Sequence, residues 1–116
     1  MKKIDKPWGF EEIIEHNEYY VLKKLCMNKG HKCSVQFHRM KKETVYLLSG
    51  SLNIYIGDAR NDLAVKPTLL KPNDSLTIEP GVVHRMEAVE DSIYLEASTP
   101  ELDDVVRLSD EYGRVG

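Results

Sequence analysis

Residues 30–51 read GHKCSVQFHRMKKETVYLLSGS, and this stretch alone indicates a protein built from β-strands. Its first half alternates with period two, so that Ser34, Gln36 and His38 share one face of a strand. Five residues after His38, Glu43 opens a second apolar segment, which ends at a glycine. A strand with one polar face presents that face either to solvent or to a cavity. The stretch therefore predicts two strands in sequence and leaves the surroundings of the polar face open.

The rest of the chain repeats this pattern of short apolar segments between turn residues. The seven glycines and five prolines fall mainly between runs rich in Val, Ile, Leu, Thr and Tyr, as in an all-β sandwich or barrel. We expect strands near residues 10–16, 19–27, 33–38, 44–49, 51–56, 63–70, 75–78, 83–89 and 92–98. In the tail, 100–112, acidic residues precede Val105 and Val106, as they would at the start of a helical turn. The sequence therefore predicts one all-β domain, 1–116, with a short C-terminal helical turn.

Composition excludes several classes of protein. Of the 116 residues 41% are hydrophobic and 30% charged, which is ordinary for a globular domain that buries its own core. Sixteen Lys and Arg stand against nineteen Asp and Glu, and this net charge of -3 argues against a nucleic-acid partner. No apolar run has the length of a membrane span, the first residues lack an apolar signal core, and two cysteines make no disulfide framework. We therefore expect a cytoplasmic protein without a membrane partner.

Three residues form a candidate metal site. His38 and Glu43 are five positions apart, and His84 follows a tight Pro-Gly turn much later in the chain. Two imidazoles and one carboxylate are the donor set of many open catalytic sites for divalent metals. Spacing alone does not decide the matter, because a solvated strand edge and a surface histidine after a turn explain the same residues. Both interpretations stay open at this point.

The order of these motifs resembles the cupin superfamily. Residues 30–51 are similar to the first cupin motif, and residues 80–84 (PGVVH) are similar to the second. Residues 6–11 (KPWGFE) and 103–114 (DDVVRLSDEYGR) resemble the entry and tail signatures of type II mannose-6-phosphate isomerases. In that family the domain often forms the C-terminal part of a mannose-1-phosphate guanylyltransferase. The resemblance covers residues 6–114, and the three signatures occur in the family's order.

This resemblance implies a fold, a cofactor and a substrate class. The fold would be the cupin double-stranded β-helix, a jelly-roll barrel. A divalent ion (Zn, Mn, Fe, Co or Ni) would be held by His38, Glu43 and His84, with either a Gln36 oxygen or water as a fourth ligand. The substrate would be a sugar phosphate, with the mannose 6-phosphate and fructose 6-phosphate pair as the leading candidates for aldose–ketose interconversion.

Two positions depart from the family pattern. Met40 stands where the family has a further metal-binding histidine, and Lys41 stands where it has a catalytic arginine. A thioether suits these metals poorly, so we expect Met40 to be an apolar filler near the barrel mouth. Lys41 is the candidate catalytic and substrate-binding residue, although it also fits a simple loop charge. Arg85 is a second substrate-binding candidate, although a regular strand would point its side chain away from that of His84.

Two classes of function follow from these residues. The first is the sugar-phosphate isomerase, and the second is a non-catalytic cupin that binds a small molecule or carbohydrate. Two histidines and a glutamate also suit a non-haem iron oxygenase, but the front and tail signatures argue against that class. Barrels of this type often pair through an exposed sheet, and five tyrosines in strand segments would suit an interface, so we expect a homodimer.

Overall fold

The computed structural model describes residues 2–57 and 66–113, which form strands joined by turns and loops with no α-helix among them. The strands are β1 (Lys2–Lys6), β2 (Gly9–His16), β3 (Val21–Met27), β4 (Val35–Phe37), β5 (Glu43–Ser49), β6 (Leu52–Ile56), β7 (Thr68–Leu70), β8 (Ser75–Ile78), β9 (His84–Ala88), β10 (Ser92–Ser98) and β11 (Val106–Ser109). None of the described residues belongs to a helix that could cross a membrane.

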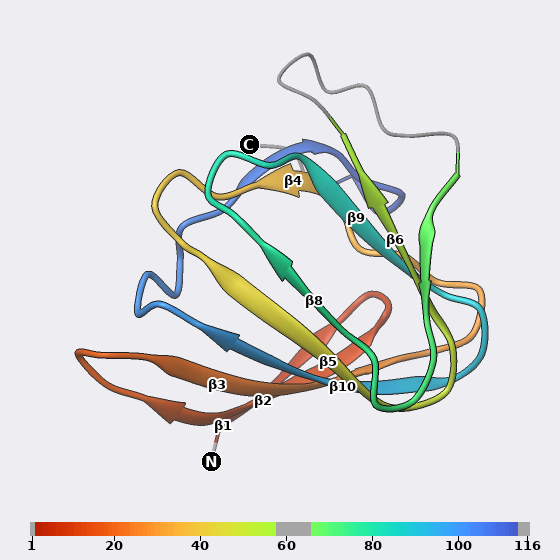
Figure 1. Cartoon of the computed structure of the whole chain (residues 1–116), viewed down its shortest axis with the longest axis horizontal. Helices are drawn as coiled ribbons and strands as arrows, with labels where there is room; N and C mark the ends of the chain where they lie inside the picture. Colours follow the sequence, from red (N-terminus) through yellow and green to blue (C-terminus); the bar gives the residue numbers. More distant parts are fainter. Residues whose placement is uncertain (1, 58–65, 114–116) are drawn as a thin grey trace.

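Two antiparallel sheets enclose the core (Figure 1). The first has the strand order β1-β2-β3-β10-β5-β8, and the second has the order β11-β4-β9-β6-β7. The chain passes between the sheets repeatedly, for example from β4 to β5 and from β9 to β10. This crossing between two facing sheets is the jelly-roll arrangement. The predicted all-β double-stranded β-helix is confirmed.

The period-two alternation places one face of each long strand in the core. In β3, Val21 and Leu25 are buried, and Lys23 between them is buried on the same face. In β5 the buried face begins with Glu43 and continues with Val45. Full burial of an apolar side chain stabilises the fold by roughly 1.5–3 kcal/mol, whereas an unpaired buried charge destabilises it. The two charged residues therefore lie at positions where apolar residues would give a more stable core.

The C-terminal segment forms a strand, so the predicted helical turn is wrong. The residues before it make tight turns, with the Asp104 N–H donating to the Glu101 carbonyl at 3.3 Å. β11 then pairs antiparallel with β4, with Val106 opposite Phe37. β-branched residues fit a pleated sheet, and pairing with the free edge of β4 outweighs the local preference of acidic residues for a helix start.

Two other boundaries differ from the expected ones. β1 was not predicted, and it lies at the edge of the six-stranded sheet, where it pairs only with β2 among the described strands. The strand expected at 63–70 appears as β7 (Thr68–Leu70), and positions 63–65 lie outside the described residues. β7 lies at the edge of the five-stranded sheet, and among the described strands it pairs only with β6.

Gly9 occupies a position where a side chain does not fit. It adopts φ +150°, and a Cβ added there would lie 1.9 Å from the carbonyl oxygen of Cys26. We expect Gly9→Ala to destabilise the protein by about 2 kcal/mol or more, because the β2–β3 pairing must shift. Urea unfolding measures this cost, with Gly30→Ala as the control. Gly30 has φ +82° but open space around it, so its substitution should cost only about 1 kcal/mol. Equal costs at the two positions would contradict the prediction.

Candidate metal centre

The structure brings His38, Glu43 and His84 together in the interior. His38 directly follows β4, Glu43 opens β5 and His84 opens β9. The His38 Nε2 atom lies 3.0 Å from Glu43 Oε1, and the His84 Nε2 atom lies 3.3 Å from the same oxygen. All three side chains are at most 2% exposed, and one candidate ligand atom from each lies within 4.8 Å of the others. The surface interpretations of these residues therefore do not apply.

Backbone carbonyls fix the orientation of both imidazole rings. The Nδ1 atom of His38 lies 2.6 Å from the carbonyl oxygen of Asp104, and that of His84 lies 2.9 Å from the carbonyl oxygen of Val82. Because a carbonyl oxygen can only accept, each Nδ1 carries a proton and donates it. In the neutral rings both Nε2 atoms are therefore acceptors, and they point at the Glu43 carboxylate. This is the orientation of metal-binding histidines that outer partners hold in place.

Two imidazole nitrogens and one carboxylate face one another in the interior, as the donors of a bound divalent metal do. Glu43 Oε2 and His84 Nε2 are buried atoms without a hydrogen-bond partner among the described residues. Burial alone would raise the pKa of Glu43, but its contacts with the His38 and His84 rings and the charge of Lys41 hold the pKa well below its usual value. An ionised carboxylate and two neutral imidazoles are donors that Zn²⁺ and similar ions accept. The donor set therefore fits the divalent metal that the sequence suggested.

The two further candidates for this centre lie differently. Gln36 lines the adjacent cavity, and its Oε1 accepts a hydrogen bond of 2.7 Å from the Ser34 hydroxyl. Its pairing partner across the sheet is His84, so the side chain is held near the cluster. Met40 is 69% exposed, so the expectation that it fills space near the barrel mouth is wrong. The turn after β4 directs this side chain to solvent, and the candidate ligands that cluster are His38, Glu43 and His84.

The two candidate substrate-binding residues also differ in their surroundings. Lys41 is only 4% exposed and lines the cavity, with its Nζ 3.9 Å from Glu43 Oε2, so it is not a simple loop charge. Arg85 is not among the described residues that line the cavity. Its Nε donates to the Cys33 carbonyl at 2.9 Å, and its Nη1 lies 3.4 Å from Glu111 Oε1. The alternation of β9 turns Arg85 away from His84, and its contacts attach the tail to the sheet.

The carboxylate of Asp104 holds the loop that carries Lys41. Its Oδ1 accepts the N–H of Arg39 at 3.0 Å, and its Oδ2 accepts those of Met40 and Lys41 at 2.7 and 2.9 Å. Its backbone carbonyl is the acceptor that orients His38. Burial would raise the pKa of Asp104, but the three N–H donors lower it. One tail residue thus fixes both the loop and a metal-binding ring.

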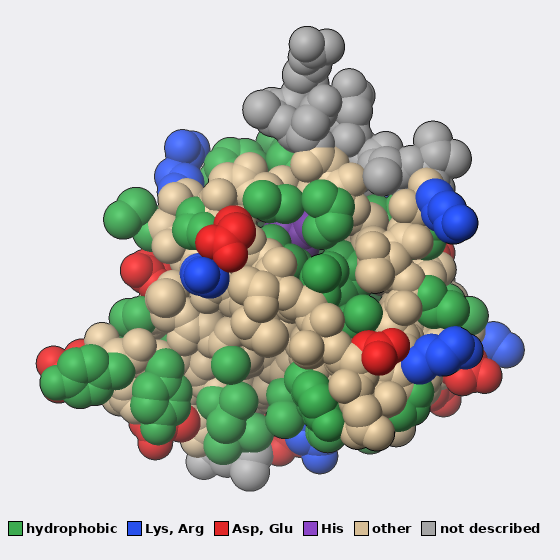
Figure 2. Space-filling model, in the orientation of Figure 1, with side chains coloured by type: hydrophobic (Ala, Val, Ile, Leu, Met, Phe, Trp, Pro, Cys, Tyr) green, Lys and Arg blue, Asp and Glu red, His purple; other side chains and the backbone are tan. Residues whose placement is uncertain are grey.

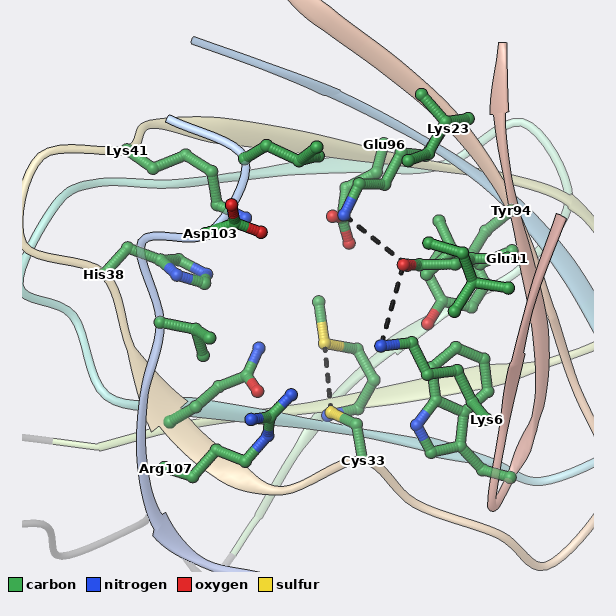
Figure 3. A pocket seen from close by; sticks show the side chains of 18 of the residues that line it. Lys6, Glu11, Lys23, Cys33, His38, Lys41, Tyr94, Glu96, Asp103 and Arg107 are labelled. Carbon is green, nitrogen blue, oxygen red and sulfur yellow. Dashed lines mark hydrogen bonds and ion pairs between the residues drawn. The ribbon is translucent and has the colours of Figure 1, made fainter. Parts of the chain in front are cut away.

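A cavity of about 390 Å³ opens beside the cluster (Figure 3). The side chains of His38 and Lys41 lie on one side of it, and those of Lys6, Glu11 and Lys23 lie on the other. The basic residues that line it are Lys2, Lys6, Lys23, Lys41 and Arg107, and the acidic ones are Glu11, Glu96 and Asp103. The lining is therefore polar and carries more basic than acidic groups.

Several of these residues were not singled out from the sequence as site residues. Arg107 lines the cavity, and its buried Nε has no hydrogen-bond partner among the described residues. Lys23 and Glu96 share strand faces with buried apolar residues. The sequence could have indicated them, because each is a charged residue that alternation places on the same strand face as buried apolar residues. Burying a charge there lowers the stability unless a partner or a ligand compensates it.

Glu96 gives the metal-free protein a distinctive pH dependence. Burial, the nearby Glu43 charge and a hydrogen bond to Glu43 raise the pKa of Glu96 to about 8, against the lowering effect of Lys41 and Lys23. The folded state therefore keeps a proton that the unfolded state loses near pH 4.5. We expect stability in EDTA to fall as pH rises from about 5 to 8. Urea unfolding at several pH values should show that Glu96→Gln, which mimics the protonated acid, flattens this decline. An unchanged slope in the variant would contradict the assignment.

Curated relatives match nearly the whole chain. Mannose-1-phosphate guanylyltransferase of Escherichia coli (strain K12) is 30% identical over 125 aligned residues, which cover 98% of this chain and 23% of that protein. The xanthan biosynthesis protein XanB of Xanthomonas campestris pv. campestris (strain B100) is 28% identical, covering 97% of this chain and 24% of the relative. The chain thus spans about a quarter of the length of these relatives.

Solved structures share the fold at low sequence identity. KdgF from Halomonas sp. superposes with a TM-score of 0.74 at 18% identity, covering 89% of this chain and 91% of that one. The capsular polysaccharide assembling protein CapF from Staphylococcus aureus superposes with a TM-score of 0.79 at 15% identity, covering 93% of this chain and 31% of that one. The family model described as mannose-6-phosphate isomerase C-terminal matches residues 1–110. With its fold, its clustered His-Glu-His donors and this match, the chain belongs to the mannose-6-phosphate isomerase C-terminal family of cupins.

Proposed function

We propose that this protein is a metal-dependent sugar-phosphate isomerase that interconverts an aldose and a ketose, with mannose 6-phosphate and fructose 6-phosphate as the pair. The observation that carries the proposal is the convergence of His38, Glu43 and His84 beside a cavity lined by basic groups. The family relationship supports the same reaction class. The two departures from the family pattern, Met40 and Lys41, make the activity a question for experiment.

The chain's own residues can supply most of what the reaction needs. A divalent ion at the cluster supplies Lewis-acid polarisation of a substrate oxygen when bound. Lys41, buried at the cavity wall, places an ammonium group where negative charge develops on the substrate as its carbon loses a proton. The proton must pass between adjacent carbons, and we assign this transfer to Glu96, whose ionised carboxylate can accept it from one carbon and return it to the next.

The proposal is tested by metal content and turnover together. The protein is purified without chelator, its metal is quantified, and conversion of mannose 6-phosphate is followed. We expect about one divalent ion per chain and a turnover that His38→Ala abolishes, because one ligand is lost. Lys42→Ala is the matched control, since Lys42 is an exposed neighbour paired with Glu79 at 3.4 Å. A chain that binds no divalent metal even when the metal is added would refute the proposal.

The alternative is a non-catalytic cupin that binds a small molecule or carbohydrate. The exposed side chain of Met40 favours it, because this loop provides no histidine at that position to complete the family's ligand set. Stoichiometric metal and measurable sugar-phosphate binding without turnover would support this alternative. Lys41→Arg then becomes the decisive variant, because it restores the planar group of the family pattern. Turnover that appears only in Lys41→Arg would show that the pocket is intact and has lost its catalytic group.

We also propose a cytoplasmic homodimer. A sugar phosphate is a dianion that does not cross a hydrocarbon layer unaided, so this substrate places the protein in the cytoplasm. The outward face of the six-stranded sheet carries apolar side chains, among them Ile14, Leu22, Leu48 and Leu95. Figure 2 shows hydrophobic side chains along the lower edge of the molecule, where this sheet lies in Figure 1. Elution as a 13 kDa species in gel filtration would contradict the proposed dimer.

A further inference from the structure

Three charged residues from the N-terminal strands meet across the cavity from the metal centre. Lys6 ends β1, Glu11 lies in β2 and Lys23 lies in β3. The Lys6 Nζ atom is 3.7 Å from Glu11 Oε1, and the Lys23 Nζ atom is 3.5 Å from Glu11 Oε2. Figure 3 shows this group facing His38 across the cavity. We name these three residues the lysine wall.

The lysine wall carries more positive charge than its carboxylate can neutralise. Two ammonium groups share the single carboxylate of Glu11, and the side chains of Lys23 and Glu11 are only 10% and 9% exposed. The whole lining has five basic and three acidic residues, so it keeps two surplus positive charges even when every acid is ionised. If the carboxylate of Glu43, which lies behind the lining, is also counted, one surplus positive charge remains. Part of this surplus is accessible from the cavity mouth, since the Lys6 side chain is 22% exposed, so an anion that enters the cavity can reach and compensate it.

The geometry also leaves hydrogen-bond donors for a ligand. A charge-assisted N–H···O contact is typically 2.7–2.9 Å long, so 3.5 and 3.7 Å are loose ion pairs. Each lysine has three N–H donors, and its contact with Glu11 uses one of them. Two ammonium groups on one carboxylate present converging donors at the cavity surface. A compact oxyanion with several acceptor oxygens is the complementary ligand.

We infer that Lys6 and Lys23, positioned by Glu11, bind the terminal oxyanion of the ligand that occupies the cavity. The ligand would then lie with its anionic group at the lysine wall and its other oxygens toward His38. This assignment differs from the sequence expectation, which gave substrate binding to Lys41 and Arg85. The orientation of a sugar phosphate in the cavity rests on the proposed function. The oxyanion site itself does not, because anion binding can be measured without any turnover.

Anion binding to metal-free protein tests this inference separately from catalysis. Inorganic phosphate and acetate are titrated by calorimetry into the full chain after EDTA treatment and its removal. We expect phosphate to bind the wild type, and Lys23→Met to weaken it about tenfold by removing a charged donor. Lys6→Met, at a more exposed position, should show a similar loss and guards against misfolding of the first variant. Lys24→Met is the matched control, because alternation places Lys24 on the opposite face of β3.

The outcomes separate the oxyanion site from the proposed reaction. Cobalt affinity at the metal centre should change less than twofold in both cavity variants, since neither lysine contacts the ligands. Stronger binding of phosphate than of acetate identifies a phosphorylated ligand, and the reverse identifies a carboxylated one. If phosphate and acetate both fail to bind, or if both variants bind them as the wild type does, the inference is overturned. A chain that binds phosphate at this site but turns over no sugar phosphate overturns only the proposed function.

Discussion

Glu43→Gln should weaken metal binding more than 100-fold and should also lower the stability of the metal-free fold. The carboxylate is the only charged ligand among the three clustered residues. An amide is a far weaker ligand, and we expect the affinity for Co²⁺ to fall more than 100-fold, beyond the roughly 10–100-fold losses seen for outer partners of ligands. In the metal-free state the substitution removes the carboxylate partner of the buried Lys41 ammonium group, 3.9 Å away, so the fold loses stability as well.

Thermal unfolding with and without metal separates these two effects. Metal at about 100 times its dissociation constant should stabilise the wild type by about 2.7 kcal/mol, and this increment should vanish in the variant. Glu79→Gln is the matched control, because it makes the same charge change at an exposed residue beside the loop. If Glu43→Gln binds cobalt as the wild type does, Glu43 is not a ligand.

Asp104→Ala should weaken metal binding even though Asp104 offers no atom to the metal. The substitution removes the acceptor of three backbone N–H groups in the loop 39–41. The loop can then move, and with it Lys41 and the carbonyl contact that orients His38. We expect the affinity for Co²⁺ to fall about 10–100-fold, the range for outer partners of metal ligands. Stability should fall by about 1–3 kcal/mol.

A graded series distinguishes positioning from general destabilisation. Asp104→Asn keeps one acceptor oxygen and should recover part of the cobalt affinity. Asp103→Ala removes the same charge at the preceding residue and should leave the affinity within twofold of the wild type. If Asp104→Ala unfolds more easily but binds cobalt with unchanged affinity once folded, the loop does not depend on this carboxylate.

The sequence indicated the metal cluster because its members lie at strand ends. His38 follows one strand, and Glu43 and His84 begin two others, so each is placed by local alternation and a nearby turn. What the sequence alone could not supply is the pairing of β4 with β9, which sets Gln36 opposite His84. Such long-range pairings depend on the whole sheet and cannot be derived from local sequence patterns. Here the resemblance to a known family predicted that the three residues come together.

The opposite wall of the cavity was missed for a physical reason. In β10 alternation separates Ile93, Leu95 and Ala97 from Tyr94 and Glu96 but does not say which set faces inward. Hydrophobicity would favour the first set, whereas the structure buries the second. The inward face of a ligand-binding barrel is polar where it meets the cavity, so the usual burial rule is reversed there.

The tail was misjudged because its partner is distant in sequence. The acids before Val105 fit a helix start locally, yet Asp104 uses its carboxylate on a loop more than sixty residues earlier. Met40 shows the same limit, since a substitution can be recognised in a motif without revealing where the side chain points. Its backbone N–H remains part of the loop structure, while its side chain faces solvent.

The contact between Asp104 and His38 also bears on how the protein is made. The two residues are 66 positions apart, and ribosomes add about 5–20 residues per second. His38 therefore emerges roughly 3–13 seconds before Asp104, the residue that orients its ring. During that interval the His38 ring lacks the carbonyl that orients it. The native geometry of the His-Glu-His cluster is thus completed late in biosynthesis, when the last strand docks.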